Sequence, residues 1–283
     1  MLDFQFIRPV GDIHLFYISS CDSTQTAIIT LIEQGAMGLA NRSLPLALYT
    51  DDQQNGRGQQ GNDWNSDVGK NITITIAFPL TPSQNIDVVL LNKALSVSIL
   101  VPIQKRVSQS LFLKWPNDIV TESKKLGGLL MEITQINQQK FLLLGFGINV
   151  NQLEWQNQPK ATSLAMIHGD AFDRDEVMDA ILFSVDDIWK NRKDLQVDYS
   201  QLLWKKGEQV ILEIQSDVRR ATSGESSLIG VGDGRNSVTD RIFSVGQQVQ
   251  GLLMDIDQEG RIVIANVDGE LLAFHHGQVR LKF

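Results

Sequence analysis

Hydrophobic positions in the first half of the chain recur mostly with the spacing of β-strands. Within residues 71–78, isoleucine or phenylalanine occupies every even position, and threonine or alanine lies between them. This period of two is typical of a strand with two different faces. Residues 27–32 instead repeat at helical spacing and are followed by Gly35, which is typical of a helix end. The pattern predicts a mixed fold in which strands outnumber helices.

The same criteria place further elements in the first 198 residues. A helix is expected at residues 86–103, and a second long helix begins at Asp173, because Glu176 completes a capping box before an apolar stripe. A polar stretch at residues 51–70 predicts a long loop, and loops of that length are commonly functional. Apolar runs predict strands at residues 13–18, 45–50, 111–115, 127–134 and 141–150, with a turn at Asn137.

The character of the chain changes after residue 198. A short helix at residues 199–206, stopped by Gly207, leads into short strands separated by glycine turns, which indicate a small β-barrel-like domain. Residues 215–241 are polar and predict a long loop or excursion. The predicted domains are residues 1–198 and 199–283. The expected strands of the second domain are residues 208–214, 248–256, 261–266 and 270–274.

Composition narrows the class of protein. A hydrophobic content of 42% and a length of 283 residues are ordinary for a soluble globular protein with one large domain or two. The 25 basic and 33 acidic residues give a net charge of −8, which argues against a nucleic-acid-binding surface. Cys21 is the only cysteine, so neither a disulfide framework nor a cysteine-based metal site is expected. Without an apolar run of about 20 residues or a signal-peptide pattern, we expect a cytoplasmic protein.

The polar loop contains the most informative segment, in which three glycines surround an arginine and a tryptophan follows. Glycine reaches positive φ at little cost, so successive N–H groups can turn toward an anion, and Arg57 adds a permanent charge. An ordinary surface loop is the alternative interpretation. The segment reads Gly56-Arg57-Gly58-Gln59-Gln60-Gly61-Asn62-Asp63-Trp64.

Three further clusters carry candidate chemistry, and each has a simpler structural interpretation. Ser23-Thr24-Gln25 lies at a strand-to-helix junction, where hydroxyls either cap the helix or contact a ligand. In Lys114-Trp115-Pro116-Asn117-Asp118, the amide and carboxylate are also typical of a turn. The segment from Lys124 to Glu132 begins with two lysines and two glycines, which would equally suit an exposed hairpin.

Taken together, these segments resemble the biotin protein ligase family. The resemblance covers roughly residues 13–167 and includes Gly69-Lys70-Asn71, Gly147-Ile148-Asn149-Val150-Asn151 and Ala161-Thr162-Ser163-Leu164. It implies an α+β catalytic fold of the class II synthetase-like type, with a mostly antiparallel sheet packed by helices. The strands after residue 198 are similar to the SH3-like β-barrel domain of that family. Family members that act as repressors have an N-terminal helix-turn-helix domain, for which we expect no room here.

The resemblance implies an ATP-dependent ligase that makes biotinyl-5′-AMP and transfers biotin to a lysine of a biotin carboxyl carrier protein. Mg²⁺ is expected with the ATP, and no metal site on the protein itself. The implied catalytic residues are Arg57, Lys125 and Asp118, with Asp118 orienting the accepting amine. The implied biotin-binding residues are Ser23, Thr24, Gln25, Gln53, Gly56, Arg57, Gly58, Gln59, Lys125 and Gly127. The implied ATP-binding residues are Arg57, Trp64, Lys114, Asn117, Lys125 and Asn149.

Two rival functions stay open at this stage. A lipoate or octanoate transfer protein shares the general fold, although the Lys114 to Asp118 segment disfavours it. A non-catalytic biotin- or adenylate-binding protein is suggested by two departures from the family pattern. Many members carry arginine directly after Gly-Arg-Gly and often after the last glycine, whereas this chain has Gln59 and Asn62. The oligomeric state and the identity of the carrier protein are not indicated.

The substitution Gln59→Arg is expected to slow the release of biotinyl-adenylate, because it restores a full positive charge near the phosphate. One additional partly exposed charge contact corresponds to roughly a fivefold lower off-rate. The measurement is the rate at which labelled adenylate leaves the purified protein. An unchanged off-rate would show that Gln59 has no part in retaining it.

Overall fold

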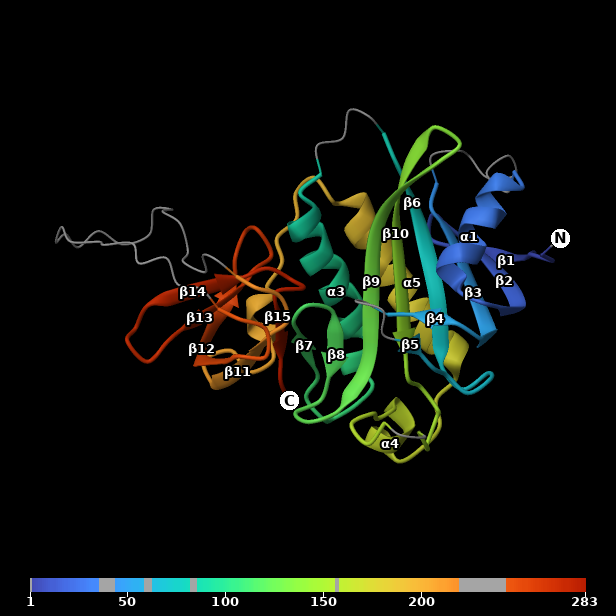
Figure 1. Cartoon of the computed structure of the whole chain (residues 1–283). Coiled ribbons are helices and arrows are strands. Elements are labelled where there is room, and N and C mark those ends of the chain that lie inside the picture. The colour runs from blue at the N-terminus through green and yellow to red at the C-terminus, as the bar shows by residue number, and fades with distance from the viewer. Residues whose placement is uncertain (1, 36–43, 59–62, 82–85, 156–157, 219–242) are drawn as a thin grey trace. The chain divides into compact units, whose positions relative to one another are not determined.

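The structure is a computed structural model that describes residues 2–35, 44–58, 63–81, 86–155, 158–218 and 243–283 (Figure 1). The chain divides into two units, Met1–Leu202 and Leu203–Phe283. Each unit is described by itself below. The first contains every residue that the sequence nominates for catalysis or binding.

Within its described residues, the first unit combines a large sheet with three α-helices of ten or more residues and two short helical turns. Its strands are β1 (Gln5–Val10), β2 (Ile13–Cys21), β3 (Leu46–Gln53), β4 (Gly56–Arg57), β5 (Asp63–Trp64), β6 (Ile72–Leu80), β7 (Phe112–Lys114), β8 (Asp118–Val120), β9 (Lys125–Ile136) and β10 (Gln139–Ile148). Its helices are α1 (Thr24–Glu33), α3 (Val88–Gln104), α4 (Leu164–His168), α5 (Arg174–Lys190) and the 3₁₀ turn η2 (Ser200–Leu202).

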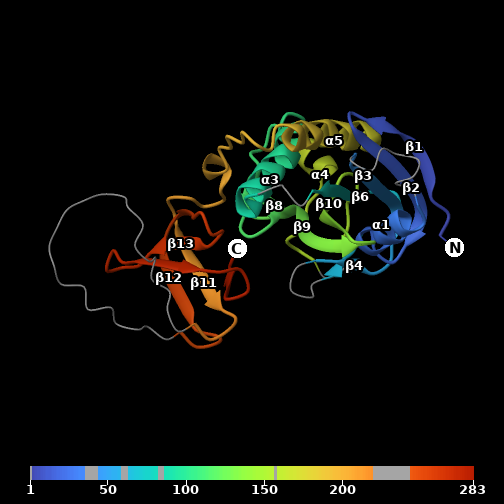
Figure 2. The same cartoon turned by 90° about the horizontal axis from the view of Figure 1, so that it is seen from above.

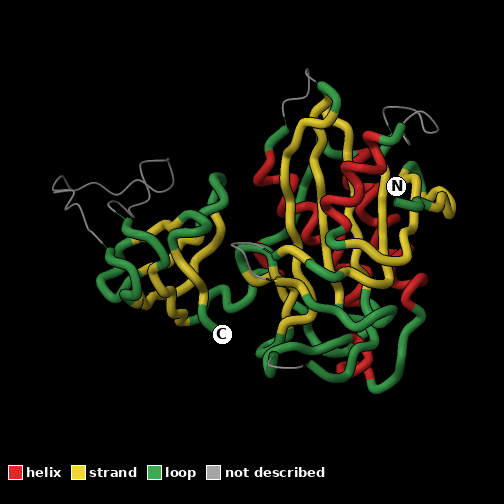
Figure 3. The backbone as a smooth tube through the Cα atoms, turned by 45° about the vertical axis from the view of Figure 1, so that its right-hand side comes forward, coloured by secondary structure: helices red, strands yellow, loops and turns green. Residues whose placement is uncertain are grey.

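Eight strands form one sheet in the order β1-β2-β3-β6-β10-β9-β8-β7. Neighbouring strands are antiparallel except β2 and β3, which run parallel and are joined through α1. A parallel pair needs such a crossover connection, whereas the antiparallel β9 and β10 are joined by a tight turn. In that turn Asn137 and Gln138 adopt φ values of 47° and 68°. The long pair β9–β10 and strand β6 form the centre of the sheet (Figure 3).

Helices cover both faces of this sheet. On one face, α1 packs its apolar side against Leu46, Ala77 and Leu143 of three neighbouring strands. On the other face, the ring of Phe78 lies 4.4 Å from that of Trp189 in α5. Because alternate residues of a strand point to opposite faces, β6 is buried on both sides. Figure 2 shows α3 and α5 together on one side of the sheet and α1 on the other.

Local sequence explains where these helices begin. Ser23 is the N-cap of α1, and Asp173 is the N-cap of α5, where its carboxylate accepts from the N–H groups of Asp175 and Glu176. Such caps satisfy N–H groups that have no partner within the helix. Among the helices in the described part of the chain, none is both long enough and apolar enough to cross a membrane.

The predicted mixed fold with a predominantly antiparallel sheet is confirmed, and several details differ, among them the unpredicted short helix α4. Strands β1 and β8 were not predicted, since β1 is an exposed edge strand and β8 has only three residues. The predicted loop at residues 51–70 starts later, because β3 extends to Gln53, and the loop contains the two-residue strands β4 and β5. The expected helix at 199–206 is reduced to the single turn η2.

The second unit is a five-stranded antiparallel sheet in the order β14-β13-β12-β11-β15. Its strands are β11 (Gln209–Ile214), β12 (Gln248–Ile256), β13 (Ile262–Ala265), β14 (Leu271–Phe274) and β15 (Val279–Leu281). Four of them were predicted, and β15 was missed because it has only three residues. Trp204 and Phe274 are almost fully buried and form part of its core.

The predicted excursion at 215–241 falls largely on residues 219–242, which lie outside the described residues. The residues that flank this segment are joined to each other. Val218 and Phe243 form an antiparallel bridge in which each N–H donates to the other residue's carbonyl, at 3.0 and 2.9 Å. The segment therefore leaves and rejoins the domain at one closed neck.

Adjacent glycines in β9 give a test of the sheet's packing. A β-carbon at Gly127 would lie 2.6 Å from the carbonyl oxygen of Gly147, and backbone cannot move aside easily. The change Gly127→Ala is therefore expected to lower the free energy of unfolding by about 1–3 kcal/mol, measured by urea denaturation. At Gly128 the nearest atoms are 3.4 Å away, so Gly128→Ala should leave stability almost unchanged. Equal losses in both variants would contradict this packing.

Candidate active site

One row of residues crosses five neighbouring strands of the large sheet, from β6 near its centre to β7 at its edge. Registered pairs connect Lys114 to Asp118, Asp118 to Gly128, Gly128 to Gly147 and Gly147 to Thr73. Residues directly opposite each other in an antiparallel pair project to the same face. The row therefore places a lysine, a carboxylate and a threonine hydroxyl beside two positions without side chains.

A third glycine widens this bare area. Gly145 pairs with Thr75 on one side and Leu130 on the other, one step along the strands from the row above. We call Gly128, Gly145 and Gly147 the glycine floor. A β-carbon on Gly145 would collide with the side-chain oxygen of Gln25, and one on Gly147 would collide with the indole ring of Trp64. Gly145 and Gly147 therefore require glycine because other groups approach the backbone closely, whereas a β-carbon at Gly128 would make only ordinary contacts.

The beginning of α1 forms one wall of the site. The Ser23 hydroxyl accepts a hydrogen bond from the N–H of Gln25 at 3.3 Å, so its interpretation as a helix cap is confirmed. Both the backbone N–H and the hydroxyl of Thr24 donate to Oε1 of Gln53, at 2.8 and 3.2 Å. The Thr24 hydroxyl also lies 2.9 Å from that of Thr75. Four residues nominated from the sequence are therefore gathered here. We call this group, Ser23, Thr24, Gln25 and Gln53, the α1 wall.

Lys125 and Asp118 form an ion pair at the edge of the glycine floor. Nζ of Lys125 lies 2.7 Å from Oδ1 of Asp118, with the side chains 39% and 21% exposed, so both remain accessible to a ligand. The start of β9 is held by a second segment, since the N–H of Lys125 donates to the carbonyl of Lys160 and its carbonyl accepts from the N–H of Thr162. Both residues were nominated as catalytic, and the structure brings them together.

The residues nominated for ATP have more varied settings. Lys114 is buried in the row described above. Asn117 uses its amide to donate to the carbonyl of Leu129, so its interpretation as a turn-stabilising residue is supported. Asn149 is buried and donates to the carbonyl of Thr162 at 2.9 Å. Trp64 covers Gly147, and its indole nitrogen is buried without a hydrogen-bond partner among the described residues.

Several nominated residues are not brought to this face, or cannot be placed. Gly127 pairs with Ile119 and Ile148 and alternates with Gly128, so it belongs to the opposite face and could reach a ligand only through its backbone. Gly56 and Gly58 lie on the loop, where a β-carbon at Gly56 would collide with the carbonyl of Trp64. Gln59 and Asn62 lie outside the described residues, as does the side chain of Arg57.

Two residues of the site were missed by the sequence reasoning. Thr75 is fully buried beneath Thr24. Glu132, on β9, accepts a hydrogen bond from Nε2 of Gln25 at 2.9 Å. Thr75 could have been found from the sequence, because a polar residue within a strand that is buried on both faces needs a polar partner. No signal of spacing could have paired Glu132 with Gln25, because strand register decides that contact.

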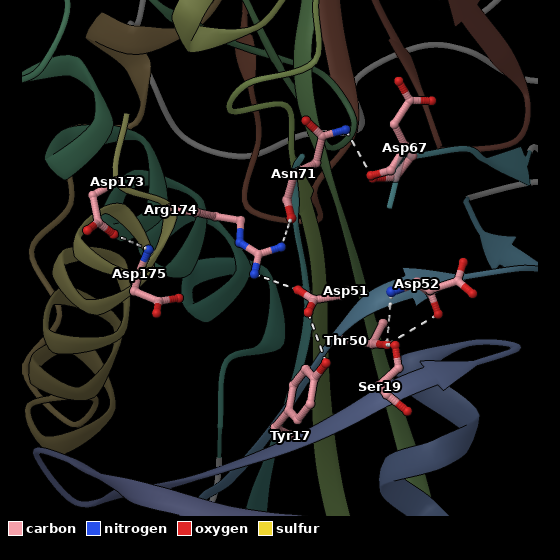
Figure 4. Close-up of polar contacts among 11 residues, drawn as sticks. Tyr17, Ser19, Thr50, Asp51, Asp52, Asp67, Asn71, Asp173, Arg174 and Asp175 are labelled. Atoms are coloured by element: carbon pink, nitrogen blue, oxygen red, sulfur yellow. Dashed lines mark hydrogen bonds and ion pairs between the residues drawn. The ribbon is translucent and has the colours of Figure 1, made fainter. Parts of the chain in front are cut away.

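An ion pair ties together the two ends of the loop that carries Gly56 and Trp64 (Figure 4). Asp51, near the end of β3 and just before the loop, lies 2.5 Å from Arg174 in α5, and its backbone carbonyl accepts from the N–H of Gly69, where the loop ends. Arg174 also donates to the carbonyl of Asn71 at 3.4 Å. The loop stem is thereby fixed to the first turn of α5.

A tyrosine completes this stem. Tyr17 donates from its hydroxyl to Oδ2 of Asp51 at 2.9 Å. Burial and this hydrogen bond raise the pKa of Tyr17 above its ordinary value, so the phenol stays protonated and remains a donor at neutral pH. Asp51 is thus held from two sides, by a cation and by a neutral donor.

Comparison with known proteins shows which proteins this chain resembles. A sequence model of the biotin/lipoate A/B protein ligase family matches residues 17–149, which include the α1 wall, the glycine floor and the Lys125–Asp118 pair. Over these residues the chain is similar to members of this family. The bifunctional ligase/repressor BirA of Bacillus spizizenii is 29% identical over 266 residues, which cover 91% of this chain and 74% of that protein. The biotin–[acetyl-CoA-carboxylase] ligase of Mycobacterium tuberculosis is 26% identical over 241 residues, covering 83% and 78%.

Solved structures of biotin protein ligases share the fold. The Aquifex aeolicus enzyme in complex with biotin and ATP superposes with a TM-score of 0.67 and 24% identity, covering 95% of this chain and 98% of that one. A point mutant of the same enzyme in complex with biotin gives 0.66 and 25% identity, covering 95% and 97%. The resemblance to the biotin protein ligase family that the motifs indicate is therefore confirmed.

The ion pair between Arg174 and Asp51 at the loop stem can be tested by mutation. Arg174→Ala removes the cation that joins Asp51 to Asn71, so we expect proteolytic cleavage between Gln54 and Val68 to become about tenfold faster under native conditions. The control is Arg8→Ala, which removes an ion pair of similar length, 2.6 Å, between β1 and Asp179 of the same helix. Equal acceleration in both variants would mean that general loosening of α5, and not the loop stem, controls cleavage.

Proposed function

We propose that this chain is an ATP-dependent ligase that activates biotin as biotinyl-5′-AMP and transfers the biotinyl group to a lysine of a biotin carboxyl carrier protein. Names of relatives support this, since the M. tuberculosis protein is a biotin–[acetyl-CoA-carboxylase] ligase and the A. aeolicus chain was solved with biotin bound. Residues 1–198 would form the catalytic domain and residues 199–283 a small C-terminal domain.

The observation that carries the proposal is the Lys125–Asp118 pair beside the glycine floor. In the first step, an oxygen of the biotin carboxylate bonds to the α-phosphorus of ATP while pyrophosphate leaves. Two anions must approach each other, and at about 4 Å two unit charges repel by about 4 kcal/mol near a protein surface. Lys125, which lies 2.7 Å from a carboxylate in this structure, is placed to exchange that partner for the two reacting anions. Arg57 would supply the second cation.

The α1 wall suits the neutral head of biotin. A ureido group offers one carbonyl and two N–H groups, so it needs a few directional partners in an otherwise apolar pocket. Ser23, Thr24 and Gln53 are the proposed partners, with the backbones of Gly56, Gly58 and Gly127 and the loop residue Gln59 nearby. Because Thr24 and Gln53 are already bonded to each other, they present their remaining donors and acceptors in fixed directions.

The nucleotide is proposed to lie toward the other end of the row. Lys114 would face the phosphates, and Trp64 with Asn117 would line the adenine. In this structure the amide of Asn117 holds the turn against β9, and that of Asn149 holds Thr162. Their contribution to ATP binding is therefore to shape the surrounding backbone more than to contact the base directly.

In the second step, the accepting lysine attacks the acyl carbon of the adenylate, and AMP leaves. A lysine of ordinary pKa is charged at neutral pH, and exposing its neutral amine costs about 4.6 kcal/mol. Asp118 is the proposed group that attracts this lysine and accepts its proton. Once Lys125 is engaged by the phosphate, Asp118 loses its present partner and can turn to the incoming amine.

Magnesium is proposed to arrive with ATP, bound to the phosphates. Within the described ranges no group of three or more histidine, cysteine, aspartate or glutamate side chains could hold a metal ion. Mg²⁺ is often bound mainly by substrate phosphates and water, so this donor set is compatible with a nucleotide-borne ion. A cytoplasmic location, where ATP is available, is part of the same proposal.

The decisive experiment is transfer of labelled biotin to a purified carrier domain. The wild-type chain should form pyrophosphate and labelled carrier, and Lys125→Ala should lower the rate of both by about 10²- to 10³-fold, because electrostatic stabilisation of the reacting anions is lost. The measurement is the initial rate of pyrophosphate release and of label incorporation.

The neighbouring change Lys124→Ala is the matched control, since it removes an equal charge one residue before β9 and should leave the rate within about twofold. Lipoate and octanoate replace biotin in parallel reactions. Faster transfer of either acid than of biotin would favour the lipoate-type alternative. Absence of pyrophosphate with every acid would favour a non-catalytic binding protein.

A further inference from the structure

Glu132 contacts the side chain of a buried residue of the α1 wall, and the proposed function gives it no task. Its carboxylate lies at the exposed side of β9 and accepts from Nε2 of Gln25, which is only 6% exposed, at 2.9 Å. An ionised carboxylate can only accept hydrogen bonds. The amide of Gln25 must therefore turn its nitrogen toward Glu132 and its oxygen the other way.

The oxygen of Gln25 is turned toward the glycine floor. It lies against Gly145, at the position that a β-carbon there would occupy, with the hydroxyl of Thr75 on the same side. The missing side chain at Gly145 is what makes this approach possible. The floor consequently carries one hydrogen-bond acceptor whose direction is decided by Glu132.

The side-chain amide of Gln53 is also held in one orientation, but by a donor and not by an acceptor. The backbone N–H of Thr24 can only donate, so the group of Gln53 that faces it must be Oε1, and Nε2 turns toward Gly56. The Thr24 hydroxyl also donates to Oε1, and it has a single proton. The 2.9 Å contact between the two threonine hydroxyls is therefore donated by Thr75.

These two amides together present one acceptor and one donor along the same wall. A ureido group is the complement, because its N–H donates and its carbonyl accepts. Building on the proposed function, we propose that Glu132 is a positioning residue that selects for a ligand N–H by holding the oxygen of Gln25 toward the floor. Without Glu132 the Gln25 amide could rotate and present either end, so the preference for an N–H would be lost.

The change Glu132→Ala is expected to raise KM for biotin about five- to tenfold with kcat within twofold, because one oriented hydrogen bond corresponds to that factor in binding. The specific measurement is discrimination between biotin and its two singly N-methylated ureido analogues. In the wild type, one of the two analogues should bind much more weakly than biotin, since its methylated nitrogen leaves the Gln25 oxygen without a donor. In Glu132→Ala this difference in affinity should be about five- to tenfold smaller.

The conservative variant Glu132→Gln separates positioning from simple structural support. Its side-chain oxygen can still accept from Gln25, so KM and discrimination should return to within about twofold of wild type. The control Glu33→Gln removes an equal charge at the far end of the helix that carries Gln25 and should change neither quantity.

Three results would overturn the inference. One is that Glu132→Ala has the KM and the discrimination of wild type. The second is that its KM rises without loss of discrimination, and the third is that Glu132→Gln behaves like the alanine variant. A wild-type chain that makes no biotinyl-adenylate would instead contradict the proposed function. Equilibrium binding of biotin and of the analogues would then still decide whether Glu132 controls recognition of the N–H group.

Discussion

The candidate site depends on the absence of side chains at the centre of an eight-stranded sheet. Gly128, Gly145 and Gly147 lie on one face of β9 and β10, and every other group of the site is arranged around them. Buried sheet surfaces normally interdigitate with the layer above at close-packed density. Here Trp64 and Gln25 approach the backbone itself, in space that any larger residue would fill. The absence of β-carbons at Gly145 and Gly147 thus lets side chains from α1 and from the loop reach the sheet backbone.

Polar groups near this surface are costly to bury, so each needs defined partners. Thr24, Gln53 and Thr75 satisfy one another through a short chain of hydrogen bonds, and Gln25 is satisfied by Glu132 at the solvent edge. Buried polar networks of this kind are favourable when complete and harmful when partial. Because the Thr24 N–H can only donate and an ionised Glu132 carboxylate can only accept, the network also fixes the direction of the Gln53 and Gln25 amides. Stability and recognition are therefore served by the same contacts.

The sequence was sufficient for most of the fold because the signals are local. The alternation in β6, the capping box at Asp173 and the glycine after α1 each act within a few residues, and each element lies where it was expected. The short strands β1, β8 and β15 carry too few alternating positions for such a signal. Their pairing is imposed by the neighbouring strands.

The candidate site was only partly accessible from the sequence. Motifs nominated Lys125 and Asp118, which pair at 2.7 Å, since they occur in segments joined by a short turn. The contact of Glu132 with Gln25 spans 107 positions of sequence, and that of Asp51 with Arg174 joins β3 to α5. Such contacts follow from strand order and register, which single-chain spacing does not encode. The pairing of β9 with β8 likewise decides that Gly128, and not the adjacent Gly127, lies on the same face as Asp118.

The bridge between Val218 and Phe243 in the second unit has a practical consequence. Since the backbones of these residues are hydrogen-bonded to each other, the two ends of the connection between β11 and β12 are held side by side. The entropy of closing a connection grows only slowly with its length, so doubling it costs roughly 0.6 kcal/mol. This neck is accordingly a natural position at which to insert an epitope, a fluorescent reporter or a partner domain.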